Sequence, residues 1–240
     1  MIFAAGLGIR LRPLTERIPK SLIEVAGVPM LERVARRLVA AGADRLIVNM
    51  HHEADRIEGF VRAHDGFGVD VVFSREPDAP LETGGGLLRA APLFRREAPF
   101  FLHNCDVVTD FDLRAMYDAH GGADALASVA VQDRSASRYL LFDAQGLCGR
   151  EDTRSGKTTW ARTPTGPVAR LGFCGVHVAR PELLNRIREQ GVFSIFETYL
   201  RLAAEGAVIR PHRIDGARWI DIGTLERLEE AGKIAAEFGI

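Results

Sequence analysis

The sequence predicts an α/β fold in which helices cover both faces of a mostly parallel sheet. Over residues 1–131, short apolar segments alternate with longer segments whose apolar residues recur at helical spacing. This alternation is typical of strand–helix–strand units. From residue 138 the pattern changes to short strands separated by turns, which predicts a small β-rich lobe at the edge of the sheet.

The elements of the first half follow from these two periodicities. Apolar segments predict buried strands at residues 1–5, 45–49, 69–73, 100–104 and 125–131. Amphipathic helices are expected between them, at residues 30–41, 53–64, 85–94 and 112–120. In the helix at 30–41, the spacing of one helix face is followed by the apolar residues Leu31, Val34, Ala35 and Leu38. Asp112 is the expected N-cap of the helix at 112–120.

The second half predicts a β-meander followed by a return to helices. Strands are expected at residues 138–142, 157–162 and 170–178, with turns at 143–146 and 155–156. The remaining expected elements are helices at 181–188, 194–205 and 225–238, and strands at 208–214 and 218–222. Because no repeat or linker interrupts the chain, we expect a single domain over residues 1–240, with a core at 1–135 and a lobe with closing elements at 136–240.

The composition limits the kinds of partner. The 240 residues carry 31 basic and 32 acidic side chains, a net charge of -1, which predicts no general attraction to nucleic acid or to an anionic membrane. Cys105, Cys148 and Cys174 lie far apart, which favours reduced thiols in a cytoplasmic protein. We expect no membrane span and no signal peptide, and a monomer or a homodimer. The first strand begins at Met1 itself, which leaves open a native start a few residues upstream.

The most informative motif is the glycine-containing loop that follows the first strand. Gly6 and Gly8 have no Cβ atom, so a phosphate chain can approach their backbone closely. Free backbone N–H groups at the carboxyl end of a strand form a concavity that binds anions. Arg10, Arg12 and Lys20 add cationic groups that can neutralise further phosphate charge. The loop therefore predicts a polyphosphate-binding site.

Two common glycine-rich phosphate loops do not fit these residues. A dinucleotide-binding fingerprint requires a third glycine where Leu11 stands, and Pro13 follows, which disfavours an NAD-dependent oxidoreductase. A P-loop requires glycine immediately before Lys-Ser, whereas Pro19 precedes Lys20. The loop instead resembles the signature of the sugar-1-phosphate nucleotidyltransferases. The matching positions are Ala4-Ala5-Gly6, Gly8, Arg10-Leu11, Pro13-Leu14-Thr15 and Pro19-Lys20.

This resemblance covers nearly the whole chain and implies both a fold and an activity. The implied fold is a Rossmann-like, mixed and mostly parallel sheet flanked by helices, with a nucleotide-binding core and a small β-rich sugar-binding lobe. The implied reaction transfers a nucleoside monophosphate from a nucleoside triphosphate to a sugar 1-phosphate and releases pyrophosphate. The implied roles are catalysis by Arg10, Lys20 and Asp106, nucleotide binding by Ala5, Gly6, Gly8, Glu82 and Gly85, and sugar binding by Asn104, Gly175 and Glu197. For Glu197 a solvated position on its helix is the alternative.

A second glycine-rich segment, Leu81–Gly86, opens a predicted helix. Its three glycines leave N–H groups bare and remove side-chain bulk, so a flat nucleobase could lie against the backbone. The resemblance places nucleobase recognition here, with Glu82 accepting a hydrogen bond from the base. The alternative is a flexible helix entrance with Thr83 as its cap.

Two aspartates far apart in the sequence are expected to bind one Mg²⁺ ion. Asp106 follows a buried strand and resembles the family's magnesium-binding Gly-Asp step, although Cys105 stands where glycine is common. Asp221 lies in residues 219–224, which resemble the family's Trp-x-Asp-x-Gly-Thr segment. A carboxylate between core-facing residues needs a cation or several hydrogen bonds. Waters and phosphate oxygens would complete the coordination of the ion.

Within the family, the compact chain and the Leu81–Gly86 segment resemble most the N-acetylmuramic acid 1-phosphate uridylyltransferases, which implies UTP as the nucleotide. Mannose- and heptose-1-phosphate guanylyltransferases are the alternative, and a non-catalytic nucleotide-sugar-binding module is the alternative from another class. Two departures bear on the sugar. The family's Glu-Lys-Pro motif, which supplies a lysine that binds the sugar phosphate, is absent from residues 140–178, where Lys157 is a candidate substitute. Ile9 replaces the usual polar neighbour of Arg10.

Overall fold

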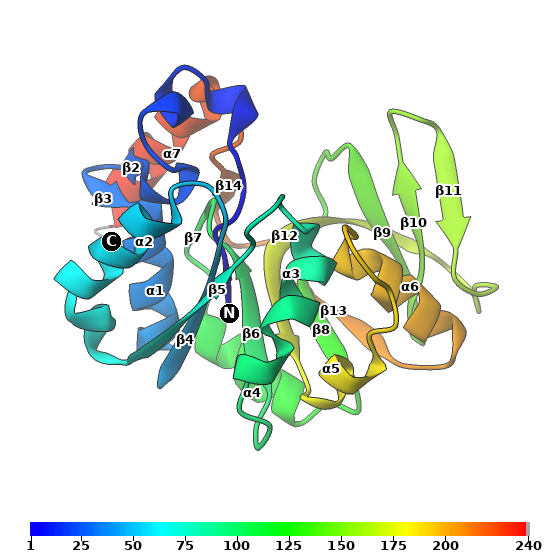
Figure 1. Cartoon of the computed structure of the whole chain (residues 1–240). Coiled ribbons are helices and arrows are strands. Elements are labelled where there is room, and N and C mark those ends of the chain that lie inside the picture. The colour runs from blue at the N-terminus through cyan, green and yellow to red at the C-terminus, as the bar shows by residue number, and fades with distance from the viewer. Residues whose placement is uncertain (239–240) are drawn as a thin grey trace.

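A mixed sheet of ten strands forms the centre of the structure, a computed structural model that describes residues 1–238 (Figure 1). Four neighbouring strands of this sheet are parallel. In spatial order they are β6 (Phe100–Asn104), β1 (Ile2–Phe3), β4 (Arg45–Met50) and β5 (Asp70–Arg75). Their carboxyl ends therefore lie at one edge of the sheet, which is the usual place of a ligand in open α/β sheets.

The rest of the sheet is largely antiparallel and continues from β6 through one long strand, β12 (Ala169–Ala179). The remaining strands are β8 (Ala127–Gln132), β9 (Arg138–Asp143), β10 (Gly146–Asp152), β11 (Lys157–Trp160) and β13 (Ile209–Arg213). β12 pairs with β6, β8 and β9, so that the lobe of β9, β10 and β11, at the right in Figure 1, is a continuation of the central sheet.

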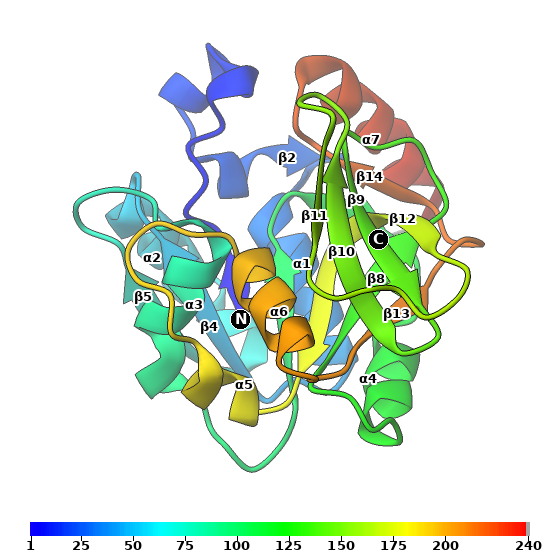
Figure 2. The same ribbon diagram turned by 90° about the vertical axis from the view of Figure 1, so that its right-hand side faces the viewer.

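Helices cover both faces of the sheet, and each face has its own buried apolar cluster. One cluster includes residues of α1 (Met30–Ala40), α2 (Ala54–Ala63), α4 (Leu113–Gly121) and α7 (Leu225–Phe238). The other includes residues of α3 (Glu82–Ala90), α5 (Glu182–Arg186) and α6 (Ile195–Ala204), and α6 lies against β10 (Figure 2). The predicted apolar face of α1 is confirmed, because Leu31, Val34, Ala35 and Leu38 are at most 1% exposed. The predicted α/β fold is confirmed.

A short antiparallel pair of strands outside the central sheet brings the segment after β6 together with the segment before α7. Its strands are β7 (Val107–Thr109) and β14 (Trp219–Asp221). Beyond this ladder, the Ile222 N–H donates to the carbonyl of Asp106 at 2.9 Å. The strand predicted at 218–222 therefore exists, but it pairs just after β6 and not within the large sheet. A second two-stranded pair consists of β2 (Glu24–Val25) and β3 (Val28–Pro29).

Several boundaries differ from the predicted ones for local reasons. β1 ends at Phe3, because Ala5 leaves the sheet to line a cavity. The predicted helix 85–94 starts at Glu82 and ends at Ala90, where a 3₁₀ turn containing Pro92 follows. β10 was not predicted. Apolar and polar residues do not alternate over residues 149–152 as they do in a half-buried strand, and the first residue of β10 belongs to the turn predicted at 143–146.

Within residues 1–238, no helix has the length and apolarity needed to cross a bilayer. Cys105, Cys148 and Cys174 are buried and unpaired. Burial keeps such thiols protonated, as it raises the pKa of Cys174 to about 11.

The glycines of α3 serve the packing of this helix against the segment that leads into α6. The N–H groups of Gly84 and Gly85 donate to the Phe193 carbonyl at 2.9 and 3.3 Å. A Cβ atom on Gly85 would lie 2.4 Å from the carbonyl oxygen of Gly191. The Thr83 hydroxyl accepts the N–H of Ile195 at 3.1 Å, so Thr83 helps to start α6 rather than α3.

We predict that Gly85→Ala lowers the free energy of unfolding by about 1–3 kcal/mol, the usual cost of overpacking a close contact. Urea unfolding followed by circular dichroism measures this change. Gly59→Ala is the control, because Gly59 lies in α2 and a Cβ there would meet nothing within 4 Å; it should leave stability unchanged or raise it by up to about 1 kcal/mol. Equal stability of the two variants would contradict the packing role of Gly85.

Candidate active site

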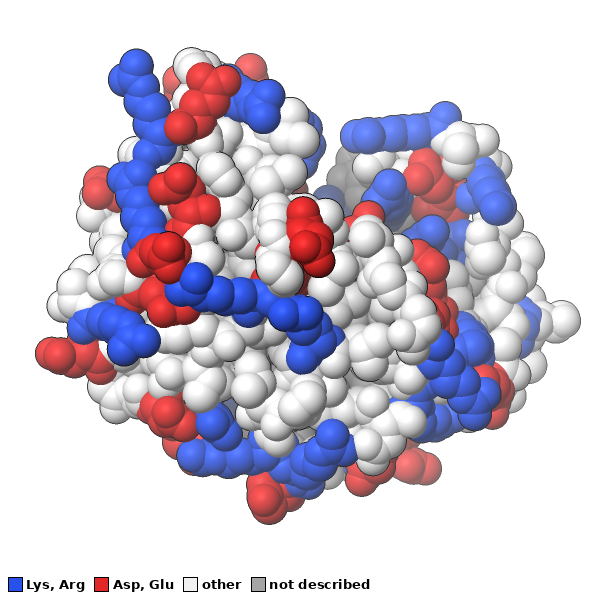
Figure 3. All heavy atoms as spheres, in the orientation of Figure 1, with Lys and Arg blue, Asp and Glu red and all other residues white. Residues whose placement is uncertain are grey.

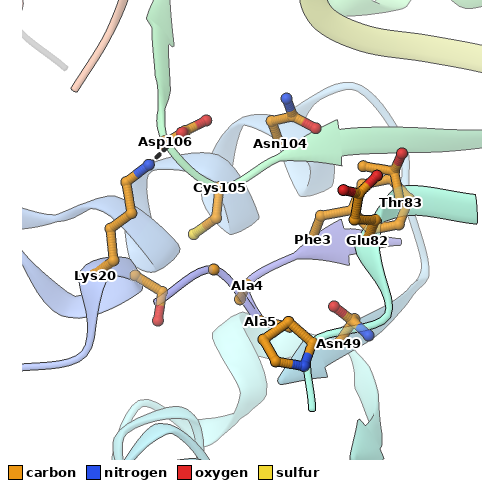
Figure 4. Close-up of a pocket in the computed structure, with 13 residues that line it drawn as sticks. Phe3, Ala4, Ala5, Lys20, Asn49, Glu82, Thr83, Asn104, Cys105 and Asp106 are labelled. Atoms are coloured by element: carbon orange, nitrogen blue, oxygen red, sulfur yellow. Dashed lines mark hydrogen bonds and ion pairs between the residues drawn. The ribbon is translucent and has the colours of Figure 1, made fainter. Parts of the chain in front are cut away.

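A cavity, here called the core cavity, lies at the carboxyl ends of β1, β4 and β6 (Figure 4). Its lining residues come from the segments after β1 and β6, from the end of β4 and from the start of α3. They are Phe3, Ala4, Ala5, Gly6, Lys20, Ser21, Asn49, Pro80, Glu82, Thr83, Asn104, Cys105 and Asp106. The predicted site residues Ala5, Gly6, Lys20, Glu82, Asn104 and Asp106 are thus brought together.

Lys20 and Asp106 form an ion pair across the core cavity, drawn as the dashed line in Figure 4. Both side chains are partly exposed, at 15% and 27%, so substrate can reach them. Lys20 opens a 3₁₀ turn just after Pro19. This cation–carboxylate pair joins the N-terminal loop to the end of β6.

Gly8 shapes the loop from behind and does not line the cavity. Its φ is +62°, and a Cβ there would lie 2.7 Å from Thr15 Cγ2 and 3.1 Å from Lys20 Cβ. The Thr15 hydroxyl also donates to the Gly8 carbonyl at 2.9 Å. Glycine is therefore required here so that the loop can fold against the stem of Lys20. The expected direct contact of Gly8 with phosphate is not supported by this position.

A second cavity, here called the lobe cavity, lies between the core and the β-rich lobe and shares Glu82, Thr83, Asn104 and Asp106 with the core cavity. In Figure 3 a hollow separates the block formed by the N-terminal loop and α7 from the lobe. Gly175 also lines the lobe cavity. Its φ is +80°, and a Cβ there would lie 2.6 Å from Val107 Cγ2, so glycine is required at this close approach.

Asp106 and Asp221 line the lobe cavity together. The pairing of β7 with β14 places Asp221 directly opposite Val107. The Asp221 carboxylate accepts hydrogen bonds from Arg227 Nη1 at 2.5 Å and from the Gly223 N–H at 3.0 Å. Arg10 lines the same cavity, and its Nη2 lies 2.9 Å from where a Cβ on Gly223 would stand.

The carboxylates at this site fit a magnesium ion that receives most of its ligands from bound substrate. Within residues 1–238 no group of three or more histidine, cysteine, aspartate or glutamate side chains is placed to hold a metal. Two carboxylates from Asp106 and Asp221 nevertheless face one cavity. Mg²⁺ is commonly held by one or two carboxylates together with waters and substrate phosphates. The residues present therefore suit Mg²⁺ bound with a polyphosphate.

Glu82 has a strained backbone at the junction of the two cavities. It is an exposed residue with φ of +59°, a conformation that costs a non-glycine residue about 1–3 kcal/mol and often marks a functional site. The structure places its side chain along both cavities, which is where the predicted contact with a base requires it.

Besides Gly8, two predicted site residues lie outside the lining of both cavities. Gly85 is buried, its N–H donates to the Phe193 carbonyl, and it packs on Gly191. The glycine run thus makes room for the protein's own backbone, and contact of Gly85 with a base stays a prediction. Glu197 is exposed and completes the capping box of α6, accepting the N–H of Ser194 at 3.2 Å. This capping role accounts for its position, and its contact with a sugar stays a prediction.

Arg134 shapes the site together with Trp219, and no sequence pattern predicts its role. The Arg134 guanidinium stacks on the Trp219 ring at 3.9 Å and donates to the Phe173 carbonyl at 2.6 Å. The Trp219 ring N–H donates to the Cys174 carbonyl at 2.8 Å. No sequence pattern connects these residues, because they lie on β12, on β14 and after β8.

A buried glutamate anchors the wall of the core cavity. Glu76 is 1% exposed, and its carboxylate accepts hydrogen bonds from the Asn49 amide and from the Leu81 N–H, the latter at 2.8 Å. Gly86 leaves the space for it, because a Cβ there would lie 2.7 Å from Glu76 Oε1. Glu76 therefore fixes the segment that carries Pro80 and Glu82.

Two titratable groups near the site are kept neutral by burial. Burial raises the pKa of the Cys105 thiol, and the neighbouring Asp106 charge raises it further, so this thiol is a poor nucleophile. Burial also lowers the pKa of His103 to about 3, so this side chain carries no charge near neutral pH. Neither group supplies covalent or acid–base chemistry here.

These features define a class of protein: an α/β fold whose strand ends open onto cavities lined by a lysine-bearing loop and two carboxylates. The nucleotidyl transferase family matches residues 1–146, and the chain belongs to this family. It is 34% identical to the N-acetylmuramate alpha-1-phosphate uridylyltransferase of Caulobacter vibrioides, over 99% of this chain and 94% of that protein. It is 32% identical to the enzyme of the same name from Neisseria meningitidis, over 98% and 97% of the two chains.

A solved structure gives independent support for the fold. The UDP-glucose pyrophosphorylase of Acinetobacter baumanii superposes with a TM-score of 0.78 at 19% identity, covering 98% of this chain and 91% of that chain. The prediction of a nucleotidyltransferase is therefore confirmed by the family, and the solved structure confirms the fold.

We predict that Glu76→Ala lowers the free energy of unfolding by about 1–3 kcal/mol, because it leaves the buried Asn49 amide and Leu81 N–H without their acceptor. Urea unfolding measures the change. Glu97→Ala is the control, because Glu97 is exposed and surface substitutions usually stay within about 0.5 kcal/mol. An effect of Glu76→Ala as small as that of the control would show that the anchor is not needed.

Proposed function

We propose that this protein transfers a uridylyl group from UTP to N-acetylmuramic acid 1-phosphate, with Mg²⁺, and releases pyrophosphate in the cytoplasm. The observation that carries the reaction type is the convergence of Lys20, Asp106 and Asp221 where the core cavity meets the lobe cavity. The choice of substrates is supported by the two relatives with this activity in their names, which match almost the whole chain. The odd, sparse and unpaired cysteines support the cytoplasm.

The chemistry requires positioning and charge neutralisation more than acid–base catalysis. A sugar 1-phosphate is largely a dianion at neutral pH, because its second pKa is about 6. Its oxygen can attack the α-phosphorus of UTP in line without a general base, and pyrophosphate leaves on the opposite side. An enzyme for this step must bring two polyanions together and offset their repulsion.

The residues around the junction suit these tasks. Lys20 would lie between the α-phosphate and the sugar phosphate, exchanging its contact with Asp106 for contacts with phosphate. Backbone N–H groups at Ala5 and Gly6 would bind phosphate oxygens of UTP, and Arg10 would hold the departing pyrophosphate. Mg²⁺ on Asp106 and Asp221, when bound, supplies charge that stabilises the phosphate oxygens.

The two cavities divide the remaining recognition. Glu82, with Pro80 and Thr83, forms the wall of the core cavity on which the base would lie, and Glu82 would accept a hydrogen bond from it. Asn104 lies at the junction and would bind sugar hydroxyls, with Gly175 providing the space beside it.

A pyrophosphate-release assay tests this function. UTP, GTP, CTP and dTTP are each combined with N-acetylmuramic acid 1-phosphate, mannose 1-phosphate or heptose 1-phosphate in the presence of Mg²⁺. We expect turnover that requires both substrates and is highest with UTP and N-acetylmuramic acid 1-phosphate. Preference for GTP with a neutral sugar would identify a guanylyltransferase, and binding without turnover would identify a non-catalytic module.

We predict that Lys20→Ala and Asp106→Asn each lower kcat about 10²-fold or more, the scale for losing one group that stabilises charge in the transition state. The rates are measured at saturating UTP and sugar 1-phosphate. Lys157→Ala is the control, because Lys157 is exposed in β11 and lies outside both cavities. Near-normal turnover of both site variants would refute the assigned roles.

We predict that Asp221→Asn raises the Mg²⁺ concentration for half-maximal rate by about tenfold or more, because a ligand carboxylate is replaced by a weaker neutral donor. The rate is titrated with Mg²⁺ at fixed UTP after the protein has been treated with EDTA. Asp215→Asn serves as the control, since Asp215 is exposed and pairs with Arg213. An unchanged Mg²⁺ requirement would remove Asp221 from the ion's coordination.

A further inference from the structure

The carboxylates that line the lobe cavity are confined to one side of it, whereas arginines line both sides. Its acidic lining residues, Glu82, Asp106 and Asp221, all lie on the core side, at α3, after β6 and on β14. The β9–β10 hairpin and the turn after it contribute arginines and no carboxylate to the lining. These arginines are Arg138, Arg150 and Arg154. A ligand that reaches the lobe therefore meets positive charge at its far end.

Arg150 combines partial burial with the lack of a partner; Arg154 also has no side-chain partner among residues 1–238, but it is exposed. Arg150 lies in β10 opposite Leu140, a core residue that is 3% exposed, so its side chain projects from the inner face of the lobe. It is only partly exposed, and within residues 1–238 its guanidinium makes no ion pair or hydrogen bond. Arg138 instead pairs with Asp152 at 3.1 Å. A partly buried guanidinium without a partner favours the binding of an anion.

The strand register separates Arg150 from the reacting phosphates. Arg150 pairs with Leu140, and Leu140 pairs with Leu171 of β12. Further along β12, Gly175 packs beside Asn104. Two strand spacings and four residues along β12 put the backbones of Arg150 and Gly175 roughly 16 Å apart. That gap exceeds the reach of one arginine side chain and leaves room for a sugar ring between the guanidinium and the junction.

We infer that Arg150 binds a carboxylate on the sugar, so that the lobe selects acidic sugar 1-phosphates. This inference rests on the proposed function and specifies how its substrate is recognised. Guanidinium and carboxylate groups match in geometry and charge and can form two parallel hydrogen bonds. In N-acetylmuramic acid 1-phosphate the carboxylate is carried by a lactyl ether on carbon 3 of the ring, and the phosphate is on carbon 1. With the phosphate at Lys20, the carboxylate points toward the lobe.

Lys157, the substitute expected from the sequence, does not fill this role. It is exposed on β11 and lies outside the lining of the lobe cavity. Arg150 also does not replace the lysine of the family's Glu-Lys-Pro motif, which binds the sugar phosphate. The position of Arg150 favours contact with the far side of the sugar.

The test compares two sugar phosphates that differ only in the lactyl ether: N-acetylmuramic acid 1-phosphate and N-acetylglucosamine 1-phosphate. Wild type, Arg150→Ala and Arg150→Lys are assayed for kcat/KM with UTP and each sugar. We expect Arg150→Ala to lose about 10- to 100-fold with the acidic sugar, as for a lost charge-assisted hydrogen bond, and to change less than about twofold with the neutral sugar. Arg150→Lys should recover part of the loss.

Arg170→Ala is the matched control. Arg170 lies in the same lobe, pairs with Glu151 at 2.8 Å and stacks on the ring of Tyr139, and it is absent from the lining of the lobe cavity. This variant should leave the preference for the acidic sugar unchanged. Thermal unfolding of each variant checks that the fold is retained.

Two outcomes would overturn the inference. Equal losses with both sugars would mean that Arg150 contacts the phosphate they share, and no loss with either would mean that it does not touch the sugar.

Equilibrium binding of the two sugar phosphates by calorimetry, with and without UTP, gives a readout that does not need turnover. If wild type binds the acidic sugar more tightly than the neutral one through Arg150 but releases no pyrophosphate, the proposed reaction fails while the inference stands.

Discussion

The site depends on one short antiparallel pairing, that of β7 with β14. Asp106 immediately precedes β7, and Asp221 ends β14, so the ladder brings the backbones of two residues that are far apart in the sequence together, and both residues line the lobe cavity. Because the Ile222 N–H also donates to the Asp106 carbonyl, the backbone is fixed at the point where both side chains leave it. Each of the two carboxylates forms an ion pair with a cation: Lys20 for Asp106 and Arg227 for Asp221.

These two ion pairs explain how the proposed metal and phosphate site can be stable before substrate arrives. A partly buried carboxylate without a partner would be destabilising, and both carboxylates have a cationic partner. In the proposed function, Lys20 would exchange Asp106 for a phosphate, and the two carboxylates would hold the divalent cation.

The lobe and the proposed reaction centre belong to the same sheet. β12 extends from the core, where it pairs with β6, into the lobe, where it pairs with β9. A ligand between the two regions would therefore contact one continuous scaffold, whose carboxylates lie at the core end and whose lobe end contributes arginines alone as charged residues. The register of the strands sets the distance between the core end and the lobe end of the cavity, and therefore the size of the sugar that fits between them.

The sequence by itself determined the α/β class, most helices and the residues of the N-terminal loop, because these depend on local periodicity and on glycine, proline and charged residues in fixed order. On these grounds the sequence predicted Lys20, Asp106 and Asp221 as site residues, although it did not show where they lie relative to one another. Only the tertiary structure decided the uses of Gly8, Gly85 and Glu197, since a glycine needed for a ligand and a glycine needed for packing have the same local pattern. The roles of Glu76, Arg134 and Arg150 also came from the fold, because they depend on burial, on strand register and on the presence or absence of a partner contributed by a distant segment.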